Sequence, residues 1–387
     1  MKKLALVSSL VLAAACGSAS SGTSGPTGTT GTTGSTGPLT WTGTAAASIT
    51  LPSGTDLHPD SGKTPEARPQ GIVSVGGKVY AVLTNLAKDT MGYFSVSGGP
   101  GLVAIIDPST NTVTKTVALG SCRNPALARV DGTTLLIPCS GDYSGSLLGG
   151  AGLAIYDTTT DTATVIDTGA SPASVARAGN EIFVGDGASG GLLRINATTH
   201  AVQNGRGGEA AITACASNSM GYAYVPDLVD TGSELLIACF NTNEIVVADR
   251  TTGVPTGVKA AVSDGPLALA WDGTTAWSAA TLANVIDAVT PGATMLTAVK
   301  KAIDLTGGGT AKSSPQQVVV DSAGDLYSVD SGTDDVVKLD PAGKKVLAAV
   351  HLDSGSDPYN LAVLSPDVVY VTQLVADKVA RLEFHGK

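Results

Sequence analysis

Charged and aromatic residues are scarce in this sequence, and runs of a single charge do not occur. Charged residues make up 14% of the chain and aromatic residues 4%, and 33 acidic residues outnumber 23 basic ones. Because Lys and Arg never cluster, the composition argues against a nucleic-acid partner or an anionic lipid surface. Beyond the N-terminus, the most apolar stretch, 279–299, is interrupted by Asp287, Pro291 and Gly292. A helix needs about 20 apolar residues to cross a bilayer, so no transmembrane helix is expected there.

Sequence motifs of metal, haem and nucleophile chemistry are missing as well. No Cys-x-x-Cys or Cys-x-x-Cys-His spacing occurs, although zinc and covalently bound haem require such spacings. The histidines fall at unrelated positions of the repeat described below: His58, His200, His351 and His385. Five neighbouring aspartates lack the spacing of a calcium loop, so exposed acidic turns are the simpler interpretation: Asp321, Asp325, Asp330, Asp334 and Asp335. We therefore expect no metal and no other cofactor.

The first fifteen residues have the layout of an export signal. Lys2 and Lys3 precede an apolar segment over residues 4–15, which is shorter than the roughly 20 residues of a membrane-spanning helix. The small residues before Cys16 resemble the lipobox of bacterial lipoproteins. This resemblance implies that Cys16 is lipidated and becomes the mature N-terminus, anchoring the protein in the cell envelope at the outer membrane. An ordinary secretory peptide is the alternative.

A tether is predicted between the export signal and the folded part of the chain. Residues 16–40 are nearly all Gly, Ser, Thr and Pro, a composition that cannot bury apolar surface and behaves as a flexible linker. The predicted organisation is therefore a signal peptide over 1–15, a tether over 16–40 and a folded head over 41–387. Without Lys2 and Lys3, 21 basic and 33 acidic residues remain, a formal net charge of −12.

One short unit recurs seven times along the head. Each unit begins with a proline that opens an apolar strand, and the anchor prolines are Pro69, Pro125, Pro172, Pro226, Pro266, Pro315 and Pro358. A second strand follows about ten residues later, after a Gly or Asp pair such as Gly76-Gly77 that suits a tight hairpin. A third strand, usually ending in an acidic turn, and a fourth strand complete most units. Four alternating strands per unit are typical of a β-propeller blade.

The repeat count predicts an all-β fold, a seven-bladed β-propeller with four-stranded blades. The last unit ends after its third strand, at Phe384, whereas the segment 46–51 reads as a strand without a partner. If this N-terminal strand becomes the fourth strand of the last blade, it closes the ring and removes two exposed sheet edges. We therefore predict a ring closed by the segment 46–51.

Two features of the unit carry a resemblance to a known family. The third strands end in Asp-Pro or Asp-Thr turns, as at Asp107, Asp157 and Asp340, and the last unit contains Tyr370-Val371-Thr372-Gln373. Over residues 65–387 the chain thus resembles the YVTN-repeat family of seven-bladed propellers. The resemblance implies an architecture only, because the family includes binders, scaffolds and enzymes and its motif residues are structural.

The four cysteines after Cys16 predict two disulfides, since even numbers of cysteines in exported chains are commonly paired. Cys139 and Cys239 end the second strands of two blades, and Cys122 and Cys215 precede the first strands of the same blades. In a propeller these two places emerge on one face. The favoured pairing is therefore Cys122–Cys139 with Cys215–Cys239, and a four-cysteine metal site lacks the required spacing.

Two places are candidates for function, and neither contains a predicted catalytic residue. The first is a pair of unusually long loops after the second strands of blades 1 and 2, with binding candidates Lys88, Asp89, Met91, Tyr93, Phe94, Asp142 and Tyr143. The second is the mouth of the central channel, where residues follow the anchor prolines: Gln70, Asp227, Gln316 and Tyr359. Ala126, Ala173 and Leu267 occupy the other equivalent positions, which argues against a charged catalytic ring.

The sequence thus favours a membrane-anchored envelope lipoprotein whose propeller is a non-catalytic scaffold that binds an envelope protein or polysaccharide. Aromatic residues on rigidly supported loops are a common binding surface, so the blade 1 and 2 loops are the leading site. The alternative is an enzyme or small-ligand binder that uses the channel mouth, as lactonase-type and dehydrogenase-type propellers do. Such an enzyme would need a cation or several carboxylates that converge on the mouth.

Overall fold

The computed structural model describes residues 41–54, 65–88, 94–95, 99–141, 149–204, 212–292, 294–306 and 312–386. For residues 87–88 and 94–95 only the backbone is described. The predicted signal peptide, Cys16 and the predicted tether lie outside these residues. The described part of the chain contains no helix that could span a membrane.

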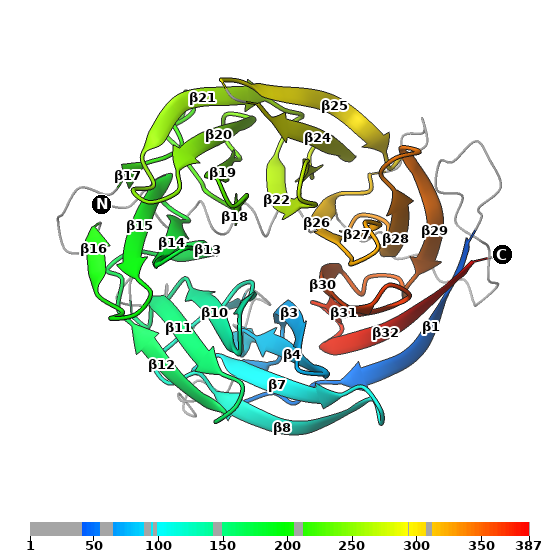
Figure 1. The fold of residues 1–387 in the computed structure, drawn as a ribbon. Helices are drawn as coiled ribbons and strands as arrows, with labels where there is room; N and C mark the ends of the chain where they lie inside the picture. The colour runs from blue at the N-terminus through cyan, green and yellow to red at the C-terminus, as the bar shows by residue number, and fades with distance from the viewer. Residues whose placement is uncertain are drawn as a thin grey trace.

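The protein is a ring of seven antiparallel sheets arranged around a central axis, as predicted (Figure 1). In each blade the first strand lies nearest the axis and the last strand lies at the periphery. Five of the inner strands begin at their anchor proline, namely those of blades 1, 3, 5, 6 and 7. Proline suits the first position of a strand because it cannot donate a ladder hydrogen bond.

The first four blades have the following strands, from the axis outward. Blade 1 contains β3 (Pro69–Val75), β4 (Lys78–Leu83), β7 (Leu102–Asp107) and β8 (Thr112–Ala118). Blade 2 contains β9 (Arg129–Asp131), β10 (Thr134–Cys139), β11 (Gly152–Asp157) and β12 (Thr162–Ile166). Blade 3 contains β13 (Pro172–Ala178), β14 (Glu181–Asp186), β15 (Gly191–Asn196) and β16 (Val202–Asn204). Blade 4 contains β18 (Leu228–Asp230), β19 (Glu234–Cys239), β20 (Glu244–Asp249) and β21 (Pro255–Ala261).

The last three blades complete the ring. Blade 5 contains β22 (Pro266–Trp271), β23 (Ala276–Ala280), β24 (Val285–Pro291) and β25 (Leu296–Asp304). Blade 6 contains β26 (Pro315–Val320), β27 (Leu326–Asp330), β28 (Asp335–Asp340) and β29 (Lys345–His351). Blade 7 contains β30 (Pro358–Ser365), β31 (Val368–Gln373), β32 (Lys378–Gly386) and, from the N-terminal side of the chain, β1 (Trp41–Thr50).

The N-terminal strand closes the ring, but its bounds differ from the prediction. β1 begins at Trp41, well before the predicted residue 46, and pairs antiparallel with β32 from Trp41 opposite Gly386 to Thr50 opposite Lys378. A bulge between Ala45 and Ala47 lies within this pairing. Sequence reasoning found only the second part of the strand because the alternation of apolar residues is interrupted at the bulge.

Two local features depart from the simple four-strand unit. In blade 3 the strand β15 pairs with both β16 and the short β17 (Ile212–Thr213), so the outer edge of this blade is divided. A separate three-stranded sheet forms from β2 (Pro65–Glu66), β5 (Leu86–Lys88) and β6 (Phe94–Ser95). Strands β5 and β6 lie within the predicted long loop of blade 1, and β2 lies in the segment that precedes the first strand of this blade.

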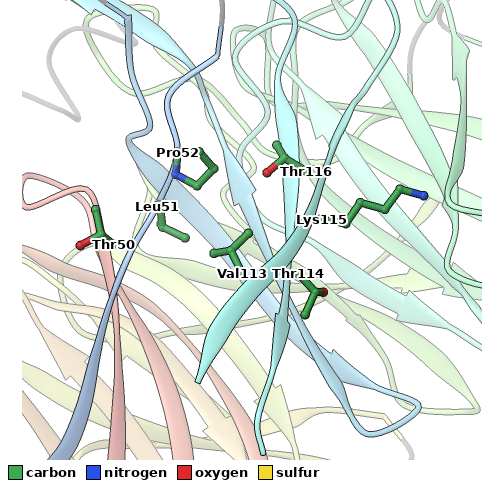
Figure 2. Close-up of a pocket in the computed structure, with 7 residues that line it drawn as sticks. All are labelled: Thr50, Leu51, Pro52, Val113, Thr114, Lys115 and Thr116. Carbon is green, nitrogen blue, oxygen red and sulfur yellow. The ribbon is translucent and has the colours of Figure 1, made fainter. Parts of the chain in front are cut away.

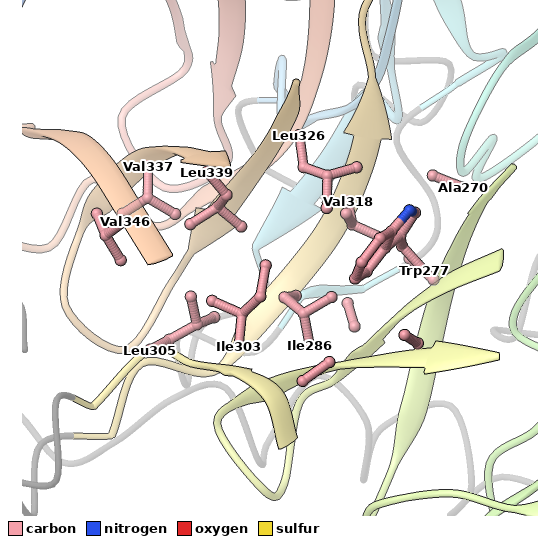
Figure 3. Close-up of a cluster of buried hydrophobic side chains, with 14 residues drawn as sticks. Ala270, Trp277, Ile286, Ile303, Leu305, Val318, Leu326, Val337, Leu339 and Val346 are labelled. Atoms are coloured by element: carbon pink, nitrogen blue, oxygen red, sulfur yellow. The ribbon is translucent and has the colours of Figure 1, made fainter. Parts of the chain in front are cut away.

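The core is divided into seven clusters of buried apolar side chains, one at each junction between neighbouring blades. The cluster between blades 5 and 6 shows the pattern (Figure 3), with Trp277 and Ile286 of blade 5 packed on Val318 and Leu339 of blade 6. Each blade therefore buries both faces of its sheet against its neighbours. This is why a single blade cannot be stable alone and why a closed ring is favoured.

Asx turns join the third and fourth strands in most blades, as the Asp-Pro and Asp-Thr pairs predicted. The carboxylate of Asp107 accepts hydrogen bonds from the Ser109 hydroxyl (2.7 Å) and amide (2.8 Å). Asp157 is bonded in the same way to Thr159. These hydrogen bonds hold the pKa values of both carboxyl groups below their usual range. The turns are thus structural, in agreement with the predicted role of the motif residues.

Asn or Asp side chains fasten each of four blades to the next. In these blades the last residue before the third strand is an Asn or Asp. Its side-chain oxygen accepts a hydrogen bond from the backbone N–H of the residue before the next anchor proline. The four acceptors are Asn243, Asn284, Asp334 and Asp377. The accepted amides belong to Gly265, Ser314, Asp357 and Arg68. The last of these bonds, from Arg68 N to Asp377 Oδ1 (2.7 Å), joins blade 7 to blade 1 and supports the closure. A buried amide needs such a partner, because these amides lie outside the sheet ladders.

Candidate functional site

The two faces of the ring differ in the length of their connections. We call the face that carries the second-to-third strand connections and the connections between blades the loop face, and the opposite face the turn face. Second-to-third strand connections have four residues in five blades: 187–190, 240–243, 281–284, 331–334 and 374–377. In blade 1 the connection is 84–101 and in blade 2 it is 140–151. The chain thus adds length on the loop face of blades 1 and 2, where the sequence predicted it.

The segment that leads from blade 1 to blade 2 holds the bases of both long loops. Gly101 N, at the end of the blade 1 loop, donates to Cys122 O (2.9 Å). Arg123 N donates to Gly150 O (2.9 Å), and Gly141 N donates to Arg123 O (3.1 Å), so both ends of the blade 2 loop are bonded to one residue. Loops with fixed bases on a rigid sheet are the usual carriers of binding residues.

Both predicted disulfides are present, and both lie on the loop face. Cys122–Cys139 ties the segment between the long loops to the end of β10, with Cα atoms 5.5 Å apart. Cys215–Cys239 ties the connection into blade 4 to the end of β19, with Cα atoms 5.3 Å apart. All four cysteines are buried. The disulfides therefore brace the face on which the chain departs from the minimal repeat.

Removal of the first disulfide is expected to destabilise the protein and loosen the two long loops. A crosslink between residues 17 positions apart contributes about 3 kcal/mol in the chain-entropy model. The double variant Cys122→Ser/Cys139→Ser should lose roughly that free energy of unfolding in urea titration, with faster amide exchange at Gly101, Arg123 and Gly141, whose amides donate the bonds at the loop bases. The control Cys215→Ser/Cys239→Ser should leave exchange at these three amides unchanged. Equal exchange in both variants would contradict a specific brace.

Most of the predicted loop-site residues lie outside the described part of the chain. Asp89, Met91, Tyr93, Asp142 and Tyr143 belong to this group. Lys88 and Phe94 lie in β5 and β6, which pair with each other at Lys88–Phe94, and only their backbone is described. The predicted binding surface of blades 1 and 2 is therefore fixed at its base, and its side chains remain a prediction.

The predicted mouth residues surround the axis on the loop face, with one exception. Gln70 is buried, and Gln316 and Tyr359 are half-buried. Asp227 instead lies one position deeper than the other three, because blade 4 lacks the bulge that follows the anchor proline in five blades. A proline-based alignment cannot register a missing bulge, which is why the sequence grouped Asp227 with the other three residues.

Asp227, itself buried, belongs to an ion pair with the partly exposed Arg129 that joins blades 2 and 4. Its carboxylate is 2.6 Å from Arg129 Nη2, and it also accepts the amides of Leu228 (2.9 Å) and Leu269 (2.8 Å). Arg129 belongs to the inner strand of blade 2, so its side chain passes the inner strand of blade 3 on the axis side. The pair therefore acts as a structural tie, and the Asp227 carboxylate is fully engaged by these four hydrogen bonds.

Three of the five aspartates that were expected in exposed acidic turns are instead buried, which corrects that prediction. Asp330 is 2% exposed, and burial raises the pKa of its carboxyl to about 8. Burial also raises the pKa of Asp357 to about 6, with Asp334 adding to the shift and Arg68 opposing it. Asp321 and Asp335 are buried too. In the described parts of the chain, no three His, Cys, Asp or Glu residues are placed to hold a metal ion.

An aromatic pair beside the axis was missed from the sequence. Tyr224, two residues before Pro226, and Phe240, directly after Cys239, have ring centroids 5.9 Å apart. Both side chains are half-buried. Phe240 N donates to Tyr224 O (3.3 Å), so the two segments that the second disulfide joins are also held by their backbones. The position of Phe240 after a strand-ending cysteine is the only sequence signal that could have pointed to it.

A shallow groove of about 480 Å³ lies at the periphery between blades 7 and 1 (Figure 2). It is lined by the end of β1 and by the outer strand β8, with residues Thr50, Leu51, Pro52, Val113, Thr114, Lys115 and Thr116. Its one charged side chain, Lys115, is bonded to Asp161 Oδ2 (2.8 Å). The groove thus offers small side chains and one paired charge, without the converging polar groups of a catalytic site.

No protein-family model and no curated protein sequence matches this chain. Solved structures of β-propellers resemble it closely in shape. A streptogramin B lyase has a TM-score of 0.61 at 12% identity, with 84% of this chain and 97% of that chain covered. The virginiamycin B lyase from Staphylococcus aureus has a TM-score of 0.61 at 14% identity, covering 89% and 99%. The Cps50 (Swd1) propeller domain of Myceliophteria thermophila has a TM-score of 0.62 at 10% identity, covering 83% and 98%.

At these identities the similarity shows the fold alone. The protein is a seven-bladed β-propeller with two disulfides, closed by its N-terminal strand. Propellers of this shape include both enzymes and domains of larger assemblies, so activity has to be argued from the site.

Proposed function

We propose that this protein is an exported, lipid-anchored protein of the cell envelope whose propeller binds a partner without catalysing a reaction. The proposed binding surface is the loop face of blades 1 and 2. The observation that carries the proposal is the one-sided elaboration of the ring: the added length of blades 1 and 2 lies on the loop face, and Cys122–Cys139 braces its base. A catalytic role would instead call for carboxylates that are free to act near the axis, and Asp227 is held in an ion pair.

The direction of the tether supports this choice of face. Trp41, the first described residue, lies opposite Gly386 at the turn-face end of β32. A tether over residues 16–40 would therefore join the head on the side opposite the long loops. A flexible chain of that length spans roughly 25–30 Å, which would leave the loop face pointing away from a membrane and open to a partner.

The test is a cross-linking capture from intact cells. The native protein is compared with a variant in which residues 86–99 and 142–148 are replaced by short Gly-Ser linkers, so that Gly101, Gly141 and Gly150 keep their backbone bonds. We expect the native protein to capture a specific envelope component and the variant to capture at least about tenfold less of it, because a few residues supply most of the binding energy of an interface. Capture is measured by quantitative mass spectrometry.

A matched control keeps the loops and changes the opposite face. The exposed Met295 and Val254 lie in connections of the turn face, and Val254→Ser/Met295→Ser should capture as much as the native protein. Both variants must unfold at the native denaturant midpoint. Capture that survives loop replacement, or that falls equally in the turn-face control, would overturn the proposed site.

A further inference from the structure

We propose that the end of the propeller axis on the loop face binds a sugar unit of a neutral polysaccharide. We call this region the axial rim and define it by two positions per blade. The first is the residue after the anchor proline, or Pro226 itself in blade 4, where Asp227 lies deeper, and the second is the first residue after the second strand. Its members are Gln70, Thr84, Ala126, Ser140, Ala173, Gly187, Pro226, Phe240, Leu267, Thr281, Gln316, Ser331, Tyr359 and Leu374. The proposal goes beyond the function proposed above, because it uses other residues of the loop face and names a class of ligand.

None of the axial-rim positions carries a charged side chain. The charged residues directly beside them are buried, with Asp186 9%, Asp227 2% and Asp330 2% exposed. Below the rim, Asp227 is neutralised by Arg129. The whole chain is acidic, with a formal net charge of −10, which disfavours an anionic glycan through like-charge repulsion. A ligand at this place is therefore expected to be neutral.

One side of the axial rim offers aromatic and small side chains. The Tyr224–Phe240 pair stands next to Ala173 and Gly187, and a Cβ on Gly187 would lie 3.1 Å from Ala173 Cβ and 3.8 Å from Tyr224 Cε2. The two positions beside the Tyr224 ring thus carry only small side chains. Leu267, half-buried in the next blade, extends the apolar side.

The other side of the axial rim offers hydroxyl and amide groups. Gln316 Nε2 donates to Ser331 Oγ (2.9 Å) and lies 3.5 Å from Thr281 Oγ1, so three rim residues form one hydrogen-bonded group. Tyr359, half-buried in the following blade, adds an uncharged phenol to this side. Because Gln316 Nε2 also donates to Ser314 O (3.1 Å), a ligand hydroxyl would donate to Gln316 Oε1, while the hydroxyls of Thr281 and Ser331 can exchange hydrogen bonds with the ligand.

A sugar ring matches this division. It presents C–H groups on its faces, which pack on aromatic rings, and hydroxyls around its edge, which exchange hydrogen bonds with amides and hydroxyls. The aromatic pair is also preorganised. Cys215–Cys239, the bond from Phe240 N to Tyr224 O (3.3 Å) and the bond from Cys215 N to Gly190 O (2.9 Å) fix its position before any ligand binds. Rigid aromatic anchors bind with little loss of conformational entropy.

The test screens the full head on an array of neutral and anionic glycan fragments and then measures the best neutral fragment by isothermal titration calorimetry. Phe240→Ala and Gln316→Ala should each weaken binding at least about fivefold. Ala173→Leu, which places a larger side chain beside Tyr224, should abolish it. Leu282→Ala, 56% exposed on the same face but outside the rim, should bind as the native protein does.

Folding and site are separated by two further measurements. Each variant must keep both disulfides and the thermal unfolding midpoint of the native protein. If an alanine variant fails to fold, Ala173→Leu provides the test of the binding site. The variant with replaced blade 1 and 2 loops should keep its glycan affinity, so failure of the loop proposal and failure of this one are distinguishable. The proposal is overturned if no neutral fragment binds, if anionic fragments bind equally well, or if Ala173→Leu binds with native affinity.

Discussion

Replacing Lys338 by alanine should lower the free energy of unfolding by about 2–4 kcal/mol, because it empties a buried site and removes several polar contacts at once. Lys338 is 1% exposed on β28. Its ammonium group donates to Tyr327 Oη (2.8 Å) and Pro366 O (3.0 Å), pairs with Asp325 Oδ2 (3.0 Å), and lies 4.1 Å from the centre of the Trp41 ring. It therefore joins blade 6, blade 7 and the closing strand.

The variant Lys338→Met separates the contribution of packing from that of the polar contacts, because methionine keeps most of the buried side-chain volume but has no charge. We expect it to lose less stability than Lys338→Ala, and amide exchange near Trp41 to accelerate in both. Urea unfolding and hydrogen exchange provide the measurements. If Lys338→Ala were as stable as the native protein, the residue would not support the closure. If both variants lost the same free energy, packing would be irrelevant and the polar contacts would carry the whole effect.

Asp330→Asn should make the free energy of unfolding less sensitive to rising pH. The folded-state pKa of Asp330 is raised from 3.8 to about 8, mainly by burial and further by Asp335. A raised folded pKa means that stability is fully present below the unfolded pKa and is lost as pH increases from 3.8 through about 8. Asparagine has no proton to lose, so the variant should exceed the native protein by roughly 3–5 kcal/mol at pH 9 and match it near pH 4.

The measurement is a series of urea titrations from pH 4 to pH 9 for the native protein, Asp330→Asn and the control Asp353→Asn, whose side chain is exposed. The control should follow the native profile. Asp357, with a pKa raised to about 6, gives the native protein a second decline between its unfolded pKa and pH 6. A native profile that is flat above pH 6 would refute the buried, protonated state of Asp330.

The two disulfides agree with an oxidising compartment. The alternating strands, the Asx turns and the two disulfide pairs were all predictable because each depends on residues close in sequence or on their place in the repeat. The seven anchor prolines also gave the number of blades. The last unit ended after three strands, so the closing strand followed from the need to pair an open edge.

Three outcomes could not be read from the sequence, because each depends on how neighbouring blades are stacked. The missing bulge in blade 4 moved Asp227 one position deeper and placed it beside Arg129, which is 98 residues away in sequence. Burial of Lys338 required blades 6 and 7 and the closing strand together. The neutral axial rim exists only once seven inner strands surround one axis.

The sequence alone therefore determined the repeating unit, its strands and turns, the closure and the disulfide pairing, since these follow from local periodicity and from unpaired edges. The tertiary structure decided which polar side chains are buried, which of them meet across blades, and which residues share the axis on the loop face. The physical reason is that a side chain's burial and charge state depend on the packing around it, and here that packing comes from strands tens to hundreds of residues apart.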